Sequence, residues 1–159
     1  IDCAFSLGSS DNWRSCTSLK NSMLSVEYLN QHSSFVSSTI YDNIFMGSEQ
    51  IDMGLLAHLM QEFNLILNYK ELDSFLELSI GESTKYSLSG GELKRLSLIR
   101  SLVRKPDILF CDEITSGVDI LNEEKMMNAI KYCCKAVFFI THSSNIVNNY
   151  STKILNLRS

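Results

Sequence analysis

The residues of this chain best suited to chemistry are Leu88-Ser89-Gly90-Gly91-Glu92, in which two adjacent glycines follow a serine. Ser89 suits the N-cap of a helix, and Glu92 completes a capping-box pattern. The glycines let backbone N–H groups of the first turn approach a ligand, and the positive end of the helix dipole favours an anion such as phosphate. Alternatively, Ser89 and Glu92 merely cap the helix. The second glycine favours the anion site, because capping needs only one permissive residue.

Two adjacent acids, Asp112 and Glu113, follow the apolar run Ile108-Leu109-Phe110-Cys111. A continuous apolar run predicts a strand buried on both faces of a parallel sheet, and open α/β sheets bind ligands at the carboxyl ends of such strands. One carboxylate there could hold Mg²⁺, and the other could orient or deprotonate an attacking water molecule. Taken alone, the pair is equally compatible with two solvated residues that begin a loop.

Helices and strands must place these groups, and their predicted order is that of an α/β protein. From Glu92 to Arg104 apolar residues recur at helical spacing, and Pro106 ends that helix. The run 136–141 predicts a second strand that is buried on both faces. The other predicted elements are a strand at 25–29, a loop at 30–34, helices at 49–67 and 71–78, a loop at 79–87, helices at 122–133 and 143–149, and a strand at 153–157. Strands and helices alternate in the C-terminal third, which predicts an α/β layer architecture.

The composition argues against several classes of protein. With 159 residues, 45% hydrophobic and 20% charged, the chain can form one globular domain. A formal net charge of −4 and the absence of a basic run argue against binding to nucleic acid. The apolar runs are too short to cross a bilayer. Five cysteines without a C-x-x-C pair predict reduced thiols.

Five motifs follow one another along the chain. They are Gln31 after the first predicted strand, Leu88 to Glu92, Ile108 to Glu113, Thr115-Ser116-Gly117-Val118-Asp119, and the strand from Val137 that leads to His142. In order and spacing they resemble the Q-loop, the LSGGQ signature, the Walker B strand with its adjoining glutamate, the D-loop stretch and the switch histidine of ATP-binding-cassette (ABC) nucleotide-binding domains. Glu92 stands where that signature has glutamine.

The resemblance implies an α/β fold, with a partial P-loop ATPase core built on a mostly parallel sheet and an α-helical subdomain that carries the LSGGE signature. We expect a single partial nucleotide-binding domain over residues 1–159. Residues 1–47 would form the Q-loop region of the core, and residues 48–105 the helical subdomain. Residues 106–159 would form the part of the core with Walker B, the D-loop and the switch histidine.

Two further segments resemble exporter-type members of the family. Residues 35–44 with Gly47 resemble the stretch L-F-x-x-T-I-x-x-N-I-x-x-G, and Ile80-Gly81-Glu82 resembles the V-G-E segment ahead of the signature. The segment between Glu82 and Leu88 is one residue longer than that pattern and lacks its usual glycine. The resemblance implies an exporter, and hence a place at the cytoplasmic face of a membrane through transmembrane domains outside this chain.

The family implies ATP and Mg²⁺ as cofactors and gives each matched residue a role. Asp112 would hold Mg²⁺, and Glu113 would act on the hydrolytic water. Gln31 would touch the metal or the water and link the site to the membrane domain, while His142 would hydrogen-bond the γ-phosphate. An isolated glutamine or histidine is usually structural, so the position of Gln31 and His142 within the motif series carries their assignment.

The signature implies a partner. In the family, Ser89, Gly90, Gly91 and Glu92 would meet the γ-phosphate of a nucleotide bound to a second nucleotide-binding domain, and Asp119 would cross the same dimer interface. Phosphoryl transfer depends mostly on positioning and charge neutralisation, so a site divided between two chains can be switched by bringing them together. Glu92 would restrain Ser89 if it closes the capping box.

The phosphate-binding loop G-x-x-x-x-G-K-[ST] does not occur in the sequence. In the family this Walker A loop and the adenine-stacking aromatic residue precede the Q-loop, so we expect a truncated domain. Trp13 and Tyr28 are predicted to pack in the core or on the surface rather than to stack on adenine. Loss of a central strand predicts self-association through an exposed sheet edge. Because the phosphate-binding loop is missing, we expect negligible ATP turnover by this chain alone.

Three functions compete at this point. The first is the ATPase of a membrane exporter, active in the full polypeptide as a dimer. The second is a degenerate partner subunit that supplies only its signature to another chain's ATP. The third is a soluble ABC protein that works on ribosomes or DNA, for which basic extensions or long coiled coils would be expected. Asp112, Glu113, Gln31 and His142 favour the first, because a degenerate half has no need of them.

Overall fold

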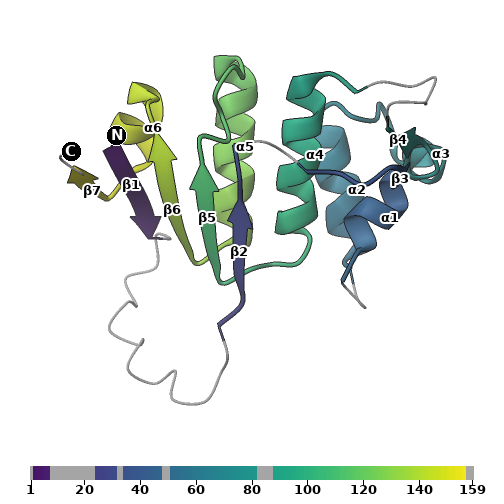
Figure 1. Cartoon of the computed structure of the whole chain (residues 1–159), viewed down its shortest axis with the longest axis horizontal. Helices are drawn as coiled ribbons and strands as arrows, with labels where there is room; N and C mark the ends of the chain where they lie inside the picture. Colours follow the sequence, from purple (N-terminus) through teal and green to yellow (C-terminus); the bar gives the residue numbers. More distant parts are fainter. Residues whose placement is uncertain (1, 8–23, 32–33, 48–50, 82–87, 157–159) are drawn as a thin grey trace.

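The computed structural model of the chain describes residues 2–7, 24–31, 34–47, 51–81 and 88–156. A five-stranded sheet lies beside a group of helices that ends in a small two-stranded sheet (Figure 1). The large sheet has the strand order β2, β5, β6, β1, β7. Its strands are β1 (Asp2–Leu7), β2 (Val26–Leu29), β5 (Ile108–Asp112), β6 (Ala136–Thr141) and β7 (Lys153–Asn156).

The parallel part of the sheet consists of β2, β5 and β6. Leu29 pairs with Cys111, and Cys111 pairs with Phe139, so the three strands end at the same edge. Helix α5 (Ile120–Cys133) connects β5 to β6, and α6 (Ser144–Tyr150) leads to β7. The predicted alternation of strand and helix in the C-terminal third is confirmed.

The strand β1 was not predicted from the sequence, and it departs from the parallel pattern. It runs antiparallel to β6 on one side and to β7 on the other. β6 is therefore paired on both sides, and β2 and β7 form the edges of the sheet.

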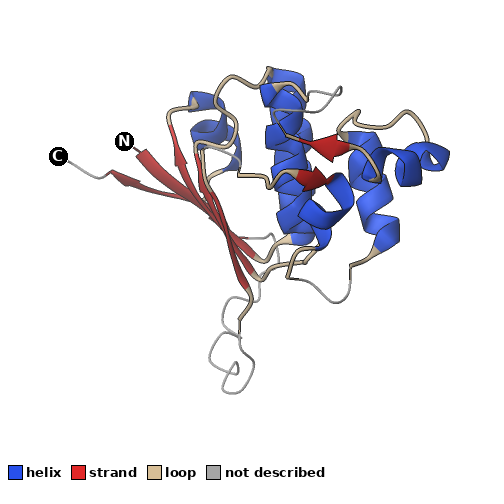
Figure 2. Cartoon of the chain, turned by 45° about the vertical axis from the view of Figure 1, so that its right-hand side comes forward, coloured by secondary structure: helices blue, strands red, loops and turns tan. Residues whose placement is uncertain are grey.

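The prediction that the central strands are buried on both faces is wrong. Leu109 and Cys111 are 0% and 2% exposed, whereas their neighbour Phe110 is 36% exposed. Tyr28, which pairs with Phe110, is 55% exposed. Helices of the described residues pack against one face of the sheet (Figure 2), so the other face keeps its apolar side chains but lacks a helical cover. Phe110 stacks there on Phe138, with ring centroids 4.8 Å apart.

Helix α4 (Gly90–Leu102) lies between α5 and β2 on one side and α1 and α2 on the other, which explains its buried side chains. Leu96, Ile99 and Leu102 are each 0% exposed. The helix begins at Gly90 rather than at Glu92 because Ser89 is its N-cap. It ends before Lys105, whose φ of 50° lies in the left-handed region.

The helix predicted over 49–67 is shorter in the structure. Helix α2 (Met53–Glu62) starts after Asp52, whose side chain accepts from the Leu55 N–H. The chain leaves the helix at Asn64, whose φ is 55°, and Leu67 is 81% exposed rather than part of a buried face. The helix predicted over 71–78 is a 3₁₀ turn, η2 (Tyr69–Glu71), followed by α3 (Leu72–Leu76).

A two-stranded sheet joins segments on either side of residue 48. Strand β3 (Ser38–Thr39) pairs with β4 (Ser79–Ile80), which lies in the predicted loop at 79–87. Helix α1 (Ile40–Phe45) follows β3 and is capped by Thr39. Strand β3 lies before the predicted domain boundary near residue 47, and its partner β4 lies after it. The division of the domain at that boundary stays a prediction.

Cys111, Cys133 and Cys134 are free thiols, as expected. In the part of the chain that the structure describes, no helix has the length and apolar character needed to cross a membrane. The predictions about Trp13, Cys16 and the segment 83–87 fall outside the described residues.

Candidate functional site

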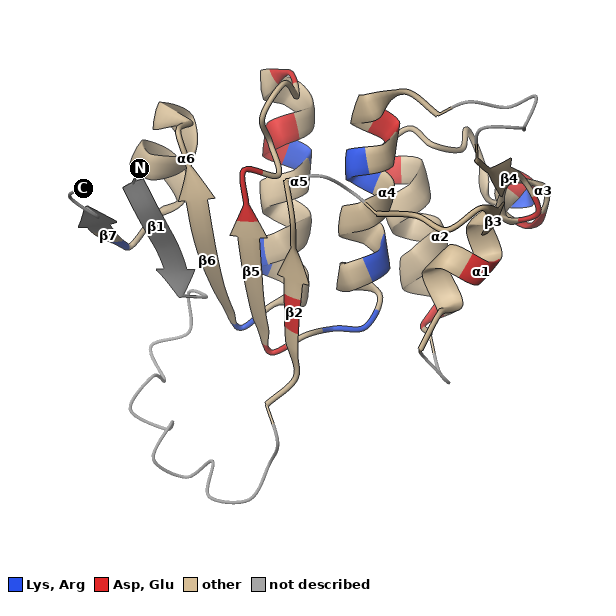
Figure 3. Ribbon diagram, viewed as in Figure 1, with Lys and Arg blue, Asp and Glu red and all other residues tan. Residues whose placement is uncertain are grey.

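The polar residues predicted to act together follow three neighbouring parallel strands. Gln31 comes shortly after β2, Asp112 ends β5, Glu113 follows it, and His142 follows β6. Because these strands are parallel and in register, their carboxyl ends bring the side chains to one edge of the sheet. The acids at the end of β5 are visible at that edge in Figure 3.

Glu113 is the centre of this site. Its Oε2 accepts a hydrogen bond of 2.8 Å from the Gln31 amide nitrogen, and its Oε1 lies 3.0 Å from His142 Nε2. The Glu113 side chain is 23% exposed, whereas that of His142 is 64% exposed. The carboxylate is thus held between two partners at the rim of the sheet, with the imidazole open to solvent.

The backbone of Glu113 is strained. Its φ of 48° lies in the left-handed region, which a residue with a side chain rarely adopts. Its N–H donates to the Ile140 carbonyl at 2.9 Å, which extends the pairing of β5 with β6 by one residue. Such strain is frequent at functional sites, where the surrounding structure holds it in place.

Asp112 lies beside Glu113 and is partly exposed. The Tyr28 hydroxyl lies 3.4 Å from Asp112 Oδ2 and donates to it. Sequence reasoning missed this contact. The strand register could have shown it, because Tyr28 pairs with Phe110 and Asp112 is the next residue on the same face of β5.

The oxygen atoms at this edge suit a hard cation. Asp112 and Glu113 supply carboxylates, and the Gln31 carbonyl oxygen remains available because its amide nitrogen is the donor to Glu113. Mg²⁺ is usually bound by one or two carboxylates while water and phosphate complete its shell. The donor set therefore fits Mg²⁺, although the described residues contain no cluster of three or more side chains that could hold a metal by themselves.

The start of α4 has the predicted capping box. The Ser89 N–H and hydroxyl donate to Glu92 Oε2 at 2.8 and 2.7 Å, and the Glu92 N–H donates to Ser89 Oγ at 3.3 Å. The hydrogen bonds from Ser89 lower the pKa of Glu92 below its usual value. Glu92 therefore does restrain Ser89 in this structure.

Crowding by the described residues does not explain the two glycines of the motif. A Cβ at Gly90 would meet no atom within 4 Å, and one at Gly91 would come within 3.4 Å only of Arg95 Nη1, at the end of a flexible side chain. The packing of the described residues therefore does not require glycine at either position.

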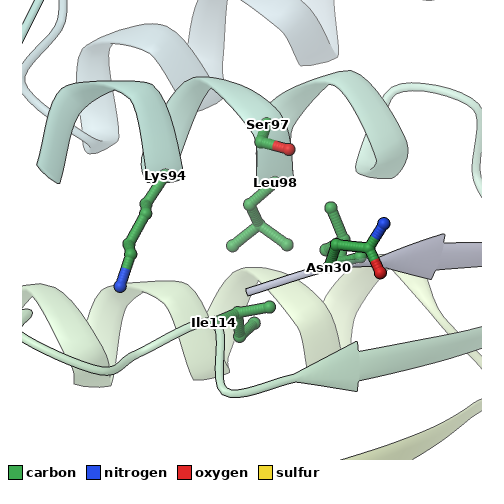
Figure 4. A pocket seen from close by; sticks show the side chains of 6 residues that line it. Asn30, Lys94, Ser97, Leu98 and Ile114 are labelled. Atoms are coloured by element: carbon green, nitrogen blue, oxygen red, sulfur yellow. The ribbon is translucent and has the colours of Figure 1, made fainter. Parts of the chain in front are cut away.

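Helix α4 is linked to the loop after Glu113. Lys94 Nζ donates to the Ser116 carbonyl. Beside this contact, Lys94, Ser97 and Leu98 of α4 face Asn30 and Ile114 across a cavity of about 10 Å³ (Figure 4). The start of α4 is thereby held against the ends of β2 and β5, a role of Lys94 that the sequence did not indicate.

Asp119 has a structural role within the chain. Its carboxylate caps α5, accepting from the Asn122 N–H at 3.0 Å and from the Asn122 side-chain amide at 2.6 Å. The residue is exposed, and these hydrogen bonds lower its pKa. A role for Asp119 at an interface stays a prediction.

Comparison with known proteins identifies the family. The sequence profile described as ABC transporter matches residues 8–116. The chain belongs to the ABC transporter family. One relative is named as an export ATP-binding/permease protein of Rickettsia prowazekii. It is 33% identical over 127 residues, which cover 76% of this chain and 21% of the relative.

Two other ABC relatives have different names. The ATP-dependent permease MDL1 of Candida albicans is 36% identical over 108 residues, covering 64% of this chain and 15% of the relative. The ATP-binding protein Uup of Buchnera aphidicola is 30% identical over 119 residues, covering 75% of this chain and 19% of the relative. This chain spans about one fifth of the length of the first relatives that it matches. It is an ABC-type ATP-binding domain with exporter-like relatives, and the family is one of ATPases.

Proposed function

We propose that this chain supplies the catalytic edge and the signature of one nucleotide-binding domain in an exporter-type ABC transporter, where ATP hydrolysis by a dimer drives transport. The observation that carries the proposal is the Glu113 carboxylate, held between Gln31 and His142 beside Asp112. A base that acts on water must be oriented, and two partners from neighbouring strands orient this one.

Each residue of the edge would have a defined task. Glu113 would orient and deprotonate the attacking water, and His142, which is exposed, would donate to the γ-phosphate. Asp112 and Gln31 would hold Mg²⁺, and the ion would neutralise phosphate charge when bound. Tyr28 would restrain the Asp112 carboxylate through its hydroxyl.

The signature would act on a second copy of the domain. Ser89, Gly90, Gly91 and Glu92 would face a γ-phosphate bound to the partner, and Asp119 would lie at the same interface. The open space around Gly90 supports this, since the chain's own packing does not require glycine there. Glu92 would have to loosen its hold on Ser89 when the partner's nucleotide arrives.

The membrane partner would be a set of transmembrane domains outside this chain, which places the domain at the cytoplasmic face of a membrane. The names of several relatives contain the words export ATP-binding/permease protein.

We also propose that residues 1–47 and 106–159 belong to the core and residues 48–105 to the helical subdomain. Without a Walker A loop of its own, the chain alone would turn over little ATP.

A second function is a degenerate subunit that lends only its signature to another chain's nucleotide. A soluble ABC protein is the third. The coding sequence upstream of Ile1 discriminates among them. A Gly-Lys-Ser/Thr loop there supports the ATPase, and several apolar segments further upstream support the exporter.

The decisive measurement is ATP hydrolysis by the full-length transporter in lipid, with Glu113→Gln compared with the parent protein. Glutamine keeps the size of the side chain but cannot take a proton from water, so we expect turnover to fall by about 10²-fold or more. Glu124→Gln is the matched control, because Glu124 is an exposed residue of α5. Unchanged turnover in Glu113→Gln would refute the assignment of Glu113, and an inactive parent would refute the ATPase itself.

A further inference from the structure

Glu123 is a buried carboxylate to which the site described above gives no role. It lies in the first turn of α5, and it is 6% exposed. Burial of an ionisable group is costly unless hydrogen bonds compensate for the lost water. Its polar contacts therefore show what the group does for the fold.

Within the described part of the chain, the side-chain hydrogen bonds of Glu123 come from the segment after His142. Ser143 Oγ lies 3.4 Å and 3.2 Å from the two carboxylate oxygens, and the Asn145 side-chain amide donates to Oε1 at 2.5 Å. Two donors of one short segment thus converge on one buried carboxylate, about 20 residues away in the sequence.

Ser143 passes this restraint to His142, which is its neighbour in the chain. The Ser143 N–H donates to Thr141 Oγ1 at 3.0 Å, and Ser143 Oγ also accepts from the Ile146 N–H as the N-cap of α6. His142 is consequently anchored on both sides, by the end of β6 before it and by Ser143 after it. Its imidazole reaches Glu113 from this anchored backbone.

We infer that Glu123 is a positioning residue for His142. It ties the His142 segment to the first turn of α5, the same turn that Asp119 caps. A shift of that turn would move Ser143, and with it the imidazole relative to Glu113. The inference rests on the proposed ATPase function, since His142 is placed there opposite the γ-phosphate.

The test compares Glu123→Ala and Glu123→Gln in the full-length protein, with Glu124→Gln as control. Alanine leaves Ser143 and Asn145 without their acceptor, so we expect kcat to fall about tenfold, because a misplaced reacting group slows the chemical step. The KM for MgATP should change less than kcat, because the binding groups stay in place. Glutamine keeps one acceptor oxygen and should restore most of the activity.

Hydrogen exchange of the 141–146 amides gives a second readout that does not depend on ATP. It should be faster in Glu123→Ala than in the parent and near the parent rate in Glu123→Gln. If Glu123→Ala does not fold, Ser143→Ala removes the same hydroxyl contact and takes its place. Parent-like kcat or parent-like exchange in the variant that loses the contact would overturn the inference. An inactive parent would sink the proposed function instead, and the exchange data would still decide whether Glu123 holds the segment.

Discussion

At the scale of single residues, the strained backbone of Glu113 places its carboxylate between two partners. The left-handed φ of 48° turns the chain sharply after β5 while the Glu113 N–H still pairs with Ile140. The carboxylate can therefore reach Gln31 on one side and His142 on the other. A glycine would adopt this backbone without strain but would lack the carboxylate, so a functional demand explains the residue better than a conformational one.

Glu92 should make the stability of the chain depend on pH. Its pKa is lower in the folded chain than the ordinary value of 4.5, because Ser89 donates to the charged form. The contribution is therefore present above pH 4.5 and is lost as the pH falls through the lower folded-state pKa. Urea unfolding of the parent and of Glu92→Gln should show a stability difference near neutral pH that shrinks in acid. A difference that persists or grows in acid would contradict this.

At the scale of elements, Arg100 of α4 and Arg104, two residues beyond its end, hold the segment that follows Gln31. Arg100 donates to the Ser34 carbonyl at 2.9 Å, and its guanidinium lies 4.8 Å from the centre of the Phe35 ring. One turn later, Arg104 donates to the Met46 carbonyl at 2.6 Å and pairs with Glu27 at 3.3 Å. The helix that begins with the signature is thereby fastened to the segment after the Q-loop. A movement of α4 would therefore also move the segment that follows Gln31, and the reverse.

Asn43 should contribute strongly to the stability of this segment. It is 0% exposed, its Oδ1 accepts from the Val36 N–H at 2.9 Å, and its amide donates to the Val36 and Thr39 carbonyls. Replacement by alanine leaves buried backbone groups unpaired, so Asn43→Ala should lower the free energy of unfolding by about 2 kcal/mol. Chemical denaturation measures this.

Asn128→Ala is the control for Asn43→Ala, since Asn128 is an exposed residue of α5. It should change the free energy of unfolding by less than about 0.5 kcal/mol. Equal effects of the two substitutions would mean that the hydrogen bonds of Asn43 do not stabilise the turn before α1.

At the scale of the whole molecule, two buried thiols report whether the sheet and helices stay packed. Cys111 and Cys134 are 2% and 6% exposed. Burial raises the pKa of Cys111 and raises that of Cys134 to about 12. Since the thiolate is the reactive form, both should resist iodoacetamide at neutral pH in the folded protein and react in urea, as read by mass spectrometry.

An introduced thiol at an exposed position calibrates that experiment. Tyr132 on α5 is 83% exposed, so Tyr132→Cys should be labelled in the folded protein. Labelling of Cys111 at the rate of the introduced cysteine would show that the face between the sheet and α5 opens easily.

The family and most of the helices and strands follow from short-range patterns in the sequence. Ser89 and Glu92 sit three residues apart and form their capping box within one turn. The apolar run before Asp112 is likewise a local pattern, and it forms β5. The motif series identifies Gln31, Glu113 and His142 as site residues. That they meet at one edge follows from the rule that parallel strands place their carboxyl ends together.

The covered faces of the sheet and the contacts between distant residues depend instead on how the elements pack in three dimensions. An apolar run shows that a strand can be buried, but it does not show that helices cover just one face and leave Phe110 exposed. Nor does any local pattern place β1 antiparallel between β6 and β7. The bond of Gln31 to Glu113 spans 82 residues, and that of Glu123 to Ser143 joins a helix to a loop. Such contacts depend on strand register and helix packing. No short stretch of sequence predicts them, because each contact joins residues from two distant segments.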